Sequence, residues 1–107
     1  MTPLEEAARL LRKYGHGAQA VTVASLAARE EARVEGVRFW ADLAGDLFGG
    51  DEAIAGVTLG SSTDVETPEL AYDRAAFRRA LYLVAQDLRL RAFESEDSER
   101  WRARLRE

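Results

Sequence analysis

Apolar residues recur at a spacing of about three to four positions through most of the chain, in segments separated by glycine, proline and serine. This spacing is typical of amphipathic α-helices. In the first segment, the apolar stripe includes Leu4 and Leu11. Thr2 is suited to the N-cap position, and Pro3 is suited to the first helical position after it. The pattern predicts a helix over residues 3–14.

The alanine-rich segment that follows predicts a second helix over residues 18–35 and a third over 36–48. Gly36 lies between them, so they are either two helices or one continuous bent helix. One face of the second helix has small side chains that would let a neighbouring helix approach closely. That face comprises Val21, Ala24, Ala28 and Ala32. We expect the third helix to be largely buried, because its apolar face is wide. That face comprises Val34, Val37, Phe39, Trp40, Ala41, Leu43, Ala44, Leu47 and Phe48.

Residues 49–67 show no regular period and are rich in glycine, serine and threonine, which predicts a long irregular connection. Within it, Asp51 is placed to cap one short turn through Ile54. Residues 57–59 have strand-forming side chains, but a single strand would have no partner. Long connections in compact domains are often functional or mobile.

The clearest helix is predicted over residues 68–93, with Thr67 as its N-cap. Its expected core positions are Leu70, Phe77, Leu81, Val84 and Leu88. Because the segment between positions 80 and 85 is apolar on nearly all sides, we expect this helix to be central. A last helix is predicted over residues 96–106. The sequence therefore predicts an all-α fold, a compact bundle of four to five helices in one domain over residues 1–107.

Composition narrows the chemistry. The chain has 107 residues, a net charge of -4 and no cysteine, which excludes disulfides, thiolate nucleophiles and cysteine-ligated metal sites. Arginine almost replaces lysine and asparagine is absent, as in proteins of GC-rich bacterial genomes. No apolar run approaches the roughly 18 residues of a membrane span. Acidic residues near the start do not resemble a signal peptide, so we expect a cytoplasmic location and no membrane association.

Few residues suggest catalysis. His16 is the only histidine and lies in a Gly-His-Gly turn, where a residue near a helix end is the simpler interpretation. The segment from Gly56 to Ser62 is rich in glycine and hydroxyl groups but lacks the lysine of a phosphate-binding loop. These patterns favour a protein that is not an enzyme and that has no cofactor.

Two acidic pairs leave one enzymatic alternative open. Their spacing resembles the acidic motifs of MazG-type nucleotide pyrophosphohydrolases, which are all-α. The resemblance implies that carboxylates on facing helices hold Mg²⁺ against the phosphates of a nucleotide. The residues that match are Glu66, Glu69, Glu94 and Asp97. Asp42 and Asp46, one helical turn apart, form an independent acidic candidate.

The C-terminal helix carries the main candidates for partner binding. Trp101 and Leu105 share one face, and tryptophan and arginine are enriched at interaction hot spots. The predicted partner-binding residues are Trp101, Arg100, Arg104 and Leu105. The alternative is that Trp101 and Leu105 attach an ordinary charged helix to the core. A nucleic-acid interface is the less favoured interpretation, because acidic residues lie between the arginines and the whole chain is acidic.

Residues 7–48 resemble an uncharacterised helical-hairpin family of GC-rich proteobacteria. The matching motifs are the segment from Tyr14 to Ala18, Tyr-Gly-His-Gly-Ala, and the later Gly36-Val37 followed by Trp40. The family has Gly-Asp before its third helix, where this chain has Glu-Ala-Arg. The resemblance implies a helical hairpin and no particular activity.

The sequence thus favours a small, non-enzymatic helical module that binds another protein as a regulator or an inhibitor. An origin in a phage or mobile element would fit these properties. A homodimer or higher homo-oligomer is a further expectation, because so short a chain carries many apolar and small-residue helix faces. The open alternatives are a Mg²⁺-dependent MazG-like hydrolase and a nucleic-acid-binding accessory protein.

Overall fold

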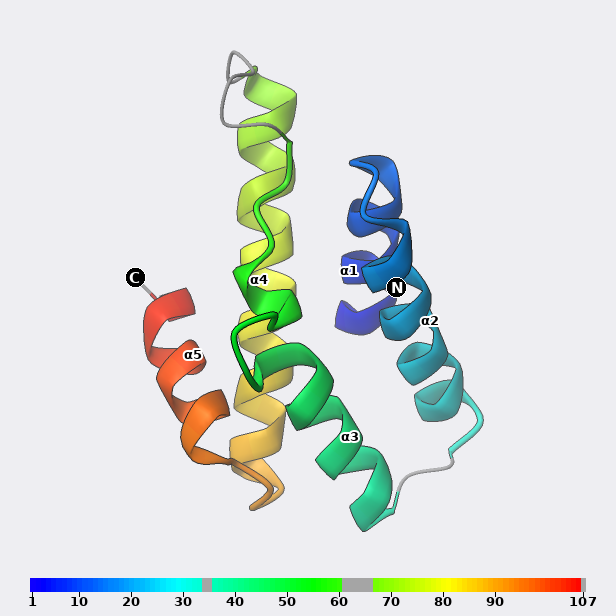
Figure 1. The fold of residues 1–107 in the computed structure, drawn as a ribbon, viewed down its shortest axis with the longest axis vertical. Helices are drawn as coiled ribbons and strands as arrows, with labels where there is room; N and C mark the ends of the chain where they lie inside the picture. The colour runs from blue at the N-terminus through cyan, green and yellow to red at the C-terminus, as the bar shows by residue number, and fades with distance from the viewer. Residues whose placement is uncertain (34–35, 61–66, 107) are drawn as a thin grey trace.

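A computed structural model describes residues 1–33, 36–60 and 67–106 of the chain. In these ranges five α-helices and one 3-10 turn follow one another without a strand, which confirms the all-α class (Figure 1). The elements are α1 (Pro3–Lys13), α2 (Gly17–Glu31), α3 (Val37–Phe48), η1 (Ile54–Gly56), α4 (Pro68–Leu90) and α5 (Glu96–Arg106). None of the described helices is both long and apolar enough to span a membrane.

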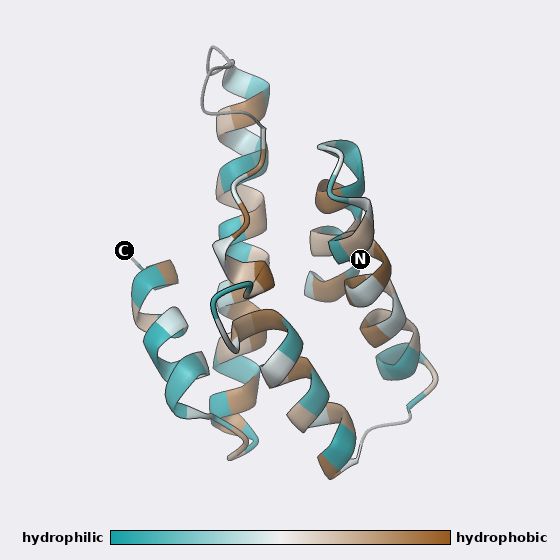
Figure 2. Ribbon diagram, in the orientation of Figure 1, coloured by the Kyte–Doolittle hydropathy of each residue, from teal (hydrophilic) through white to brown (hydrophobic). Residues whose placement is uncertain are grey.

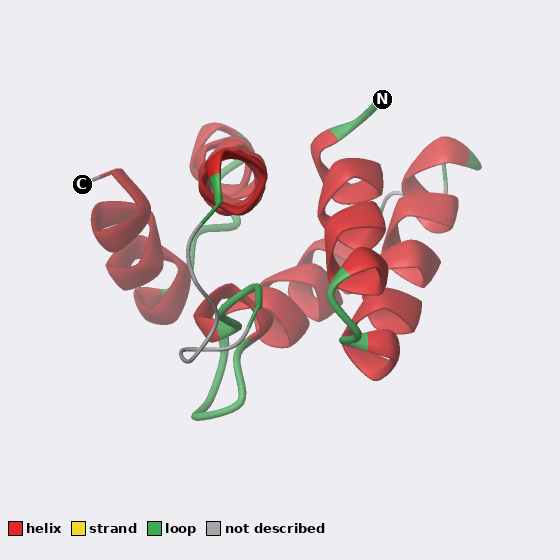
Figure 3. Cartoon of the chain, turned by 90° about the horizontal axis from the view of Figure 1, so that it is seen from above, coloured by secondary structure: helices red, strands yellow, loops and turns green. Residues whose placement is uncertain are grey.

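The long helix α4 stands between α1 on one side and α5 on the other, as expected for a central helix (Figures 1 and 3). α1 and α2 form a hairpin, and α1 runs antiparallel to α4, so that Lys13 at its end reaches Asp73 near the start of α4. α3 lies across the lower part of α4 in Figure 1 and contacts α2, η1 and α5.

Local capping signals produce the helix starts that the sequence predicts. The Thr2 hydroxyl accepts a hydrogen bond from the Glu5 backbone N–H at 3.2 Å, and the Thr67 hydroxyl accepts one from Leu70 N–H at 3.1 Å. Each bond satisfies a backbone donor that a helix start leaves free. At the start of α5, Ser95 and Ser98 each accept from the other's backbone N–H.

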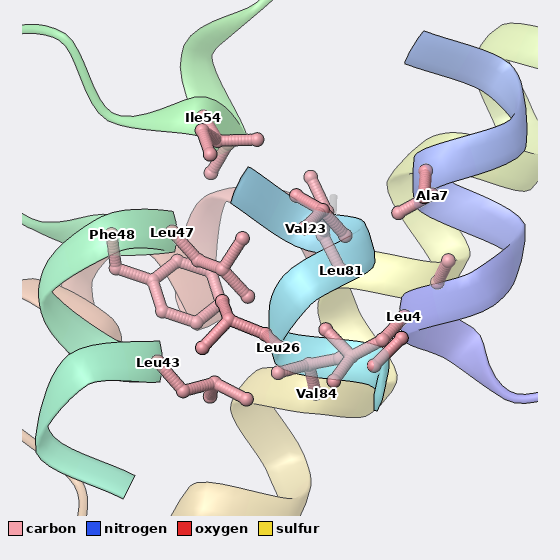
Figure 4. Packing of buried hydrophobic residues seen from close by; sticks show 14 of the residues in the cluster. Leu4, Ala7, Val23, Leu26, Leu43, Leu47, Phe48, Ile54, Leu81 and Val84 are labelled. Carbon is pink, nitrogen blue, oxygen red and sulfur yellow. The ribbon is translucent and has the colours of Figure 1, made fainter. Parts of the chain in front are cut away.

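The core is one continuous cluster of buried residues from α1, α2, α3, α4 and the connection around η1. Figure 4 shows side chains from α1, α2, α3, η1 and α4 pointing toward one another. The five core positions predicted for α4 are all buried, as is the predicted stripe of α1. Figure 2 shows hydrophobic and hydrophilic residues interleaved along the helices, with α5 largely hydrophilic. From α5, Trp101 and Leu105 pack against the cluster while staying partly exposed.

The predicted face of α2 is wrong. Val21 is 65% exposed and Ala28 is also exposed, whereas the residues that face the core are Ala20, Val23, Leu26 and Ala27. Alanine surrounds this helix, so its apolar pattern has little direction, and packing against α1 selects a face about one residue away from the predicted one. α2 also ends at Glu31, because Arg33 takes a left-handed turn with φ 58°.

The two central predicted segments form separate helices, since α3 begins only at Val37 after the extended Gly36. Two members of its predicted buried face are in fact exposed, Val37 at 71% and Ala41. The aromatic and leucine positions are buried as expected. The core wraps only half of α3, so its Val37–Ala41 edge points to solvent. The predicted core residue Val34 lies outside the described residues.

The connection after α3 departs from its prediction in one detail. The short turn begins at Ile54 after Ala53, with no side-chain cap, and does not run from Asp51 to Ile54. Ile54 and Leu59 are both buried, so apolar side chains attach this connection to the core. Residues 57–59 form no strand.

The long helix is also shorter than predicted. α4 ends at Leu90, because Ala92 takes a left-handed conformation with φ 62°. The chain then turns so that Phe93 stacks on Trp40 of α3, with 6.1 Å between ring centroids. This contact directs the chain back toward α5.

Candidate interaction surface

The structure turns the predicted binding residues of α5 partly inward. Trp101 lies against η1, where a Cβ placed on Gly56 would be 3.4 Å from the edge of the indole ring. Arg104 covers the indole, with its guanidinium carbon 5.0 Å from the ring centroid. Leu105 is half-buried against the core. This geometry favours the alternative in which Trp101 and Leu105 attach α5 to the rest of the molecule.

Carboxylates neighbour the charged residues around Trp101. Arg100 is exposed and lies 3.4 Å from Asp97 and 3.7 Å from Glu96. Arg102 donates to Glu94 at 2.9 Å across the turn before α5. The exposed Arg100 pairs contribute about 0–1 kcal/mol each. The Arg102–Glu94 pair is more sheltered, because these side chains are only 15% and 20% exposed. The α5 surface around these two arginines is therefore mixed in charge and forms no basic stripe.

The predicted metal ligands do not meet. Glu69 lies at the start of α4 and Glu94 lies beyond its end, so a 23-residue helix of about 33 Å separates them. Glu69 accepts from Lys13 at 2.6 Å, and Asp97 pairs with Arg100. No group of three or more histidine or carboxylate side chains placed to hold a metal occurs in the described residues. Glu66 lies outside them.

The remaining chemical candidates are separated as well. His16 occupies the N-cap position of α2 without a side-chain capping bond. Asp42 pairs with Arg29 at 3.1 Å, and Asp46 is exposed on the next turn of α3. His16 lies at the start of α2 and the two aspartates lie on α3, and no group of three or more possible metal ligands occurs among the described residues, so they form no common metal site.

Sequence reasoning missed a charged cluster that joins α1 to α4. The carboxylate of Asp73 is buried and accepts from Lys13 Nζ at 2.7 Å and from the Tyr14 hydroxyl at 2.6 Å. Hydrogen bonding by Lys13, and next by Tyr14, lowers the pKa of Asp73. The hydrogen bond to Asp73 raises the pKa of Tyr14. Hydrogen bonds to Asp73, and next to Glu69, raise the pKa of Lys13.

This cluster could have been noticed as a carboxylate within the apolar stripe of α4, between Leu70 and Phe77. The partners of this carboxylate could not have been predicted, because Lys13 lies 60 positions and Tyr14 lies 59 positions before it in the sequence. The Asp73 carboxylate binds Lys13 and Tyr14 of its own chain, and it lines neither of the two grooves described below. The cluster therefore fastens the end of α1 to the start of α4.

One side of α4 has no neighbouring helix in the described structure. Looking down α4, Figure 3 shows α5 on one side, α1 on the other and α3 on a third. Large apolar side chains remain exposed on α4: Tyr72 at 72%, Leu83 at 43% and Leu90 at 76%. Such residues normally occur singly on a surface, so three on one helix suggest an interaction surface.

A groove of about 510 Å³ runs beside this side of α4, between it and the start of α1. Its α4 wall includes Tyr72, Ala76 and Leu83, and its α1 wall includes Pro3 and Glu6. Small residues between the two larger side chains keep the groove open. We call this the α1–α4 groove.

A second, shallower cleft of about 310 Å³ lies on the other flank of α4, against α5. We call it the α4–α5 cleft. It is lined by Ala75, Arg78, Arg79, Tyr82, Leu105 and Arg106. Arg78 donates to the backbone oxygens of Leu105, at 3.1 Å, and Arg104. These oxygens lie in the last turn of α5, where helical partners are lacking, so Arg78 caps that helix.

No family model, curated protein or solved structure matches this chain. Its function is therefore inferred from its own residues and their geometry.

Proposed function

We propose that this chain is a small, non-enzymatic helical module that binds an amphipathic helix of another protein along the α1–α4 groove, as a regulator or inhibitor of that protein. The observation that carries the proposal is the pair of exposed side chains, Tyr72 and Leu83, on the α4 wall of an open groove. The proposal includes the cytoplasmic location predicted from the sequence.

The spacing of the exposed residues supports a helical occupant. Tyr72, Ala76, Arg79 and Leu83 alternate four- and three-residue steps along α4, which is the spacing of a helix–helix seam. Alanine at position 76 lets a second backbone approach closely between the larger side chains. Helix-in-groove binding uses a few such apolar positions on each partner.

The conformations of the groove walls also support binding. The Asp73 cluster fastens α1 to α4 close to Tyr72, and the Thr2 cap fixes the start of α1. Walls held in place before binding reduce the ordering cost that association must overcome. The groove is therefore preorganised for a ligand.

A photo-crosslinking experiment tests the proposal. A photoreactive phenylalanine analogue is placed at position 72 in the full chain. The matched control carries it at position 21 on α2, because Val21 is 65% exposed and Tyr72 is 72% exposed. We expect a discrete crosslinked protein in the native host from position 72 and none from position 21. Adding the Leu83→Glu substitution to the chain with the analogue at position 72 should abolish the crosslink, because it places a charge in an apolar contact.

Two results would contradict the proposal. One is the same set of crosslinks from positions 72 and 21, which indicates random encounter. The other is a crosslink from position 72 that Leu83→Glu leaves unchanged. Leu83 is exposed, so the substitution should leave the fold intact, and circular dichroism checks that it does.

A further inference from the structure

We infer that the helix bound by this chain carries carboxylates along one edge of its apolar stripe, and that Arg79 and Arg106 in the α4–α5 cleft bind them. The inference rests on the proposed function and specifies the chemistry of the partner. It comes from the different character of the two flanks of α4.

The two flanks lie close enough for one ligand to contact both. The α1–α4 groove and the α4–α5 cleft share Ala75 and Arg79 in their linings. A helix with its side chains is about 10–12 Å across, which exceeds the width of a single row of residues. A helix lying in the groove therefore extends over Arg79 toward the cleft.

The cleft is basic although the protein is acidic. Among the residues that the structure describes, three arginines and no carboxylate line it, in a chain whose net charge is -4. Arg78 is held by the end of α5, but Arg79 and Arg106 make no ion pair with any residue that the structure describes. Both are exposed, so their guanidinium groups are available to a ligand.

The α1–α4 groove, on the opposite flank of α4, differs from the cleft because its lining includes a carboxylate. The α1–α4 groove has both apolar and polar residues in its lining, and its carboxylate, Glu6, stands on the α1 side, 3.4 Å from Arg9. A ligand helix thus meets apolar side chains and the Glu6 carboxylate on one flank, Arg79 where the two flanks join, and Arg106 on the other flank. Arginine binds carboxylates in planar, often bidentate geometry, so acidic residues are favoured on the edge facing α5.

A second copy of this chain fits the surface poorly. The described carboxylates of α4 are Glu69, Asp73 and Asp87, and each already pairs within its own chain. Two α4 helices meeting through this side would bring Arg79 of each copy into an arginine-lined surface. Like charges facing each other oppose association. The observations therefore favour an acidic partner helix over a homodimer.

Two matched synthetic peptides test the inference with the full chain. Each is an 18-residue helical peptide with leucines on one stripe, and the flanking edge carries glutamates in one peptide and glutamines in the other. We expect fluorescence anisotropy to show about five- to tenfold tighter binding of the glutamate peptide at low salt. The preference should shrink as salt rises, because screening weakens partly exposed ion pairs.

Matched variants locate the effect. Arg79→Gln should remove most of the preference for glutamate, and Arg106→Gln should remove part of it. The control is Arg38→Gln on α3, an exposed arginine outside both the groove and the cleft, which should leave the preference unchanged. Equal binding of both peptides, or equal effects of all three substitutions, would overturn the inference.

The outcomes separate this inference from the proposed function. If both peptides bind equally and Leu83→Glu abolishes both, the helix site stands and the acidic edge is wrong. If neither peptide binds, both ideas fail. Sedimentation of a dimer that Leu83→Glu makes monomeric would identify a second copy as the occupant and overturn the acidic partner. If an oligonucleotide binds more tightly than the glutamate peptide and Arg79→Gln abolishes that binding, the acidic partner helix is overturned and nucleic acid is the ligand.

Discussion

Replacing Asp73 with asparagine tests whether the buried charged cluster holds α1 against α4. Asparagine has nearly the same shape, but its uncharged amide oxygen is a weaker acceptor than a carboxylate oxygen. Two hydrogen bonds to the carboxylate change, from Lys13 at 2.7 Å and from Tyr14 at 2.6 Å. Hydrogen bonds to charged groups contribute about 1.5–3 kcal/mol.

Partial exposure of the cation places the expected cost in the lower part of that range. The Lys13 side chain is 37% exposed while that of Asp73 is 5% exposed, so water screens one end of the pair. We expect Asp73→Asn to lower the free energy of unfolding by about 2 kcal/mol. For a domain of this size, that is a large fraction of a total of about 5–15 kcal/mol.

Urea unfolding at pH 7 measures the effect. With a slope of about 1–3 kcal/mol per molar urea, the midpoint should fall by about 1 M. The control is Glu69→Gln, because Glu69 contacts the same lysine but its side chain is 72% exposed. We expect that variant to change the midpoint by less than half as much.

The pH dependence supplies a second readout. The pKa of Asp73 lies below its usual value of 3.8, so its stabilising contribution is complete above that value and is lost as pH falls through the lowered pKa. The stability difference between the original chain and Asp73→Asn should therefore shrink in acid. The pKa values of Lys13 and Tyr14 are raised, so their contributions are complete below about pH 10 and are lost as pH rises further.

Two results would refute this account of the cluster. The first is a loss of stability from Asp73→Asn that equals the small loss from Glu69→Gln. The second is a difference between the original chain and Asp73→Asn that stays constant from pH 7 down to pH 2, because a carboxylate whose pKa is lowered by folding must lose its contribution in acid.

Two further predictions concern the attachment of α5 and the start of α4. Trp101→Ala should lower the free energy of unfolding, measured in urea, by about 2–3 kcal/mol. This loss is somewhat below the range for a fully buried tryptophan, because the ring is only half-buried against η1. Unchanged stability would show that the indole is not part of the packing. Thr67→Ala should lower the free energy of unfolding by about 1 kcal/mol, because the Leu70 N–H loses its capping acceptor. Thr67→Ser should keep most of that stability, because serine also has a hydroxyl acceptor. A serine variant as unstable as the alanine variant would contradict the capping role.

The sequence by itself determined the helical class and most of the helix starts. Thr67 followed by Pro68 specifies where α4 begins, because a cap acts on backbone groups only a few residues away. The core stripe of α4 was equally predictable, since Leu70, Phe77, Leu81, Val84 and Leu88 recur at helical spacing and all are buried. These features depend on short-range geometry, which the residue order encodes directly.

The buried face differed from its prediction in α2, where apolar residues surround the helix and favour no single face. α2 is alanine-rich around its circumference, so Val21 seemed as suitable for the core as Val23. Contact with α1 decided the matter, and Val21 is exposed while Val23 is fully buried. For Trp101 the sequence left both a binding role and a packing role open, and the position of η1 beneath the indole favours packing.

Only the tertiary structure revealed the candidate surface and the cluster that supports it. Asp73 meets Lys13 and Tyr14 because α1 and α4 run antiparallel, and no spacing along the chain encodes that meeting. The exposed side of α4, with Tyr72 above the groove, depends in the same way on where α1, α3 and α5 stop covering the helix. A helix records in its sequence how much apolar surface it has, but its neighbours decide how much of that surface remains uncovered.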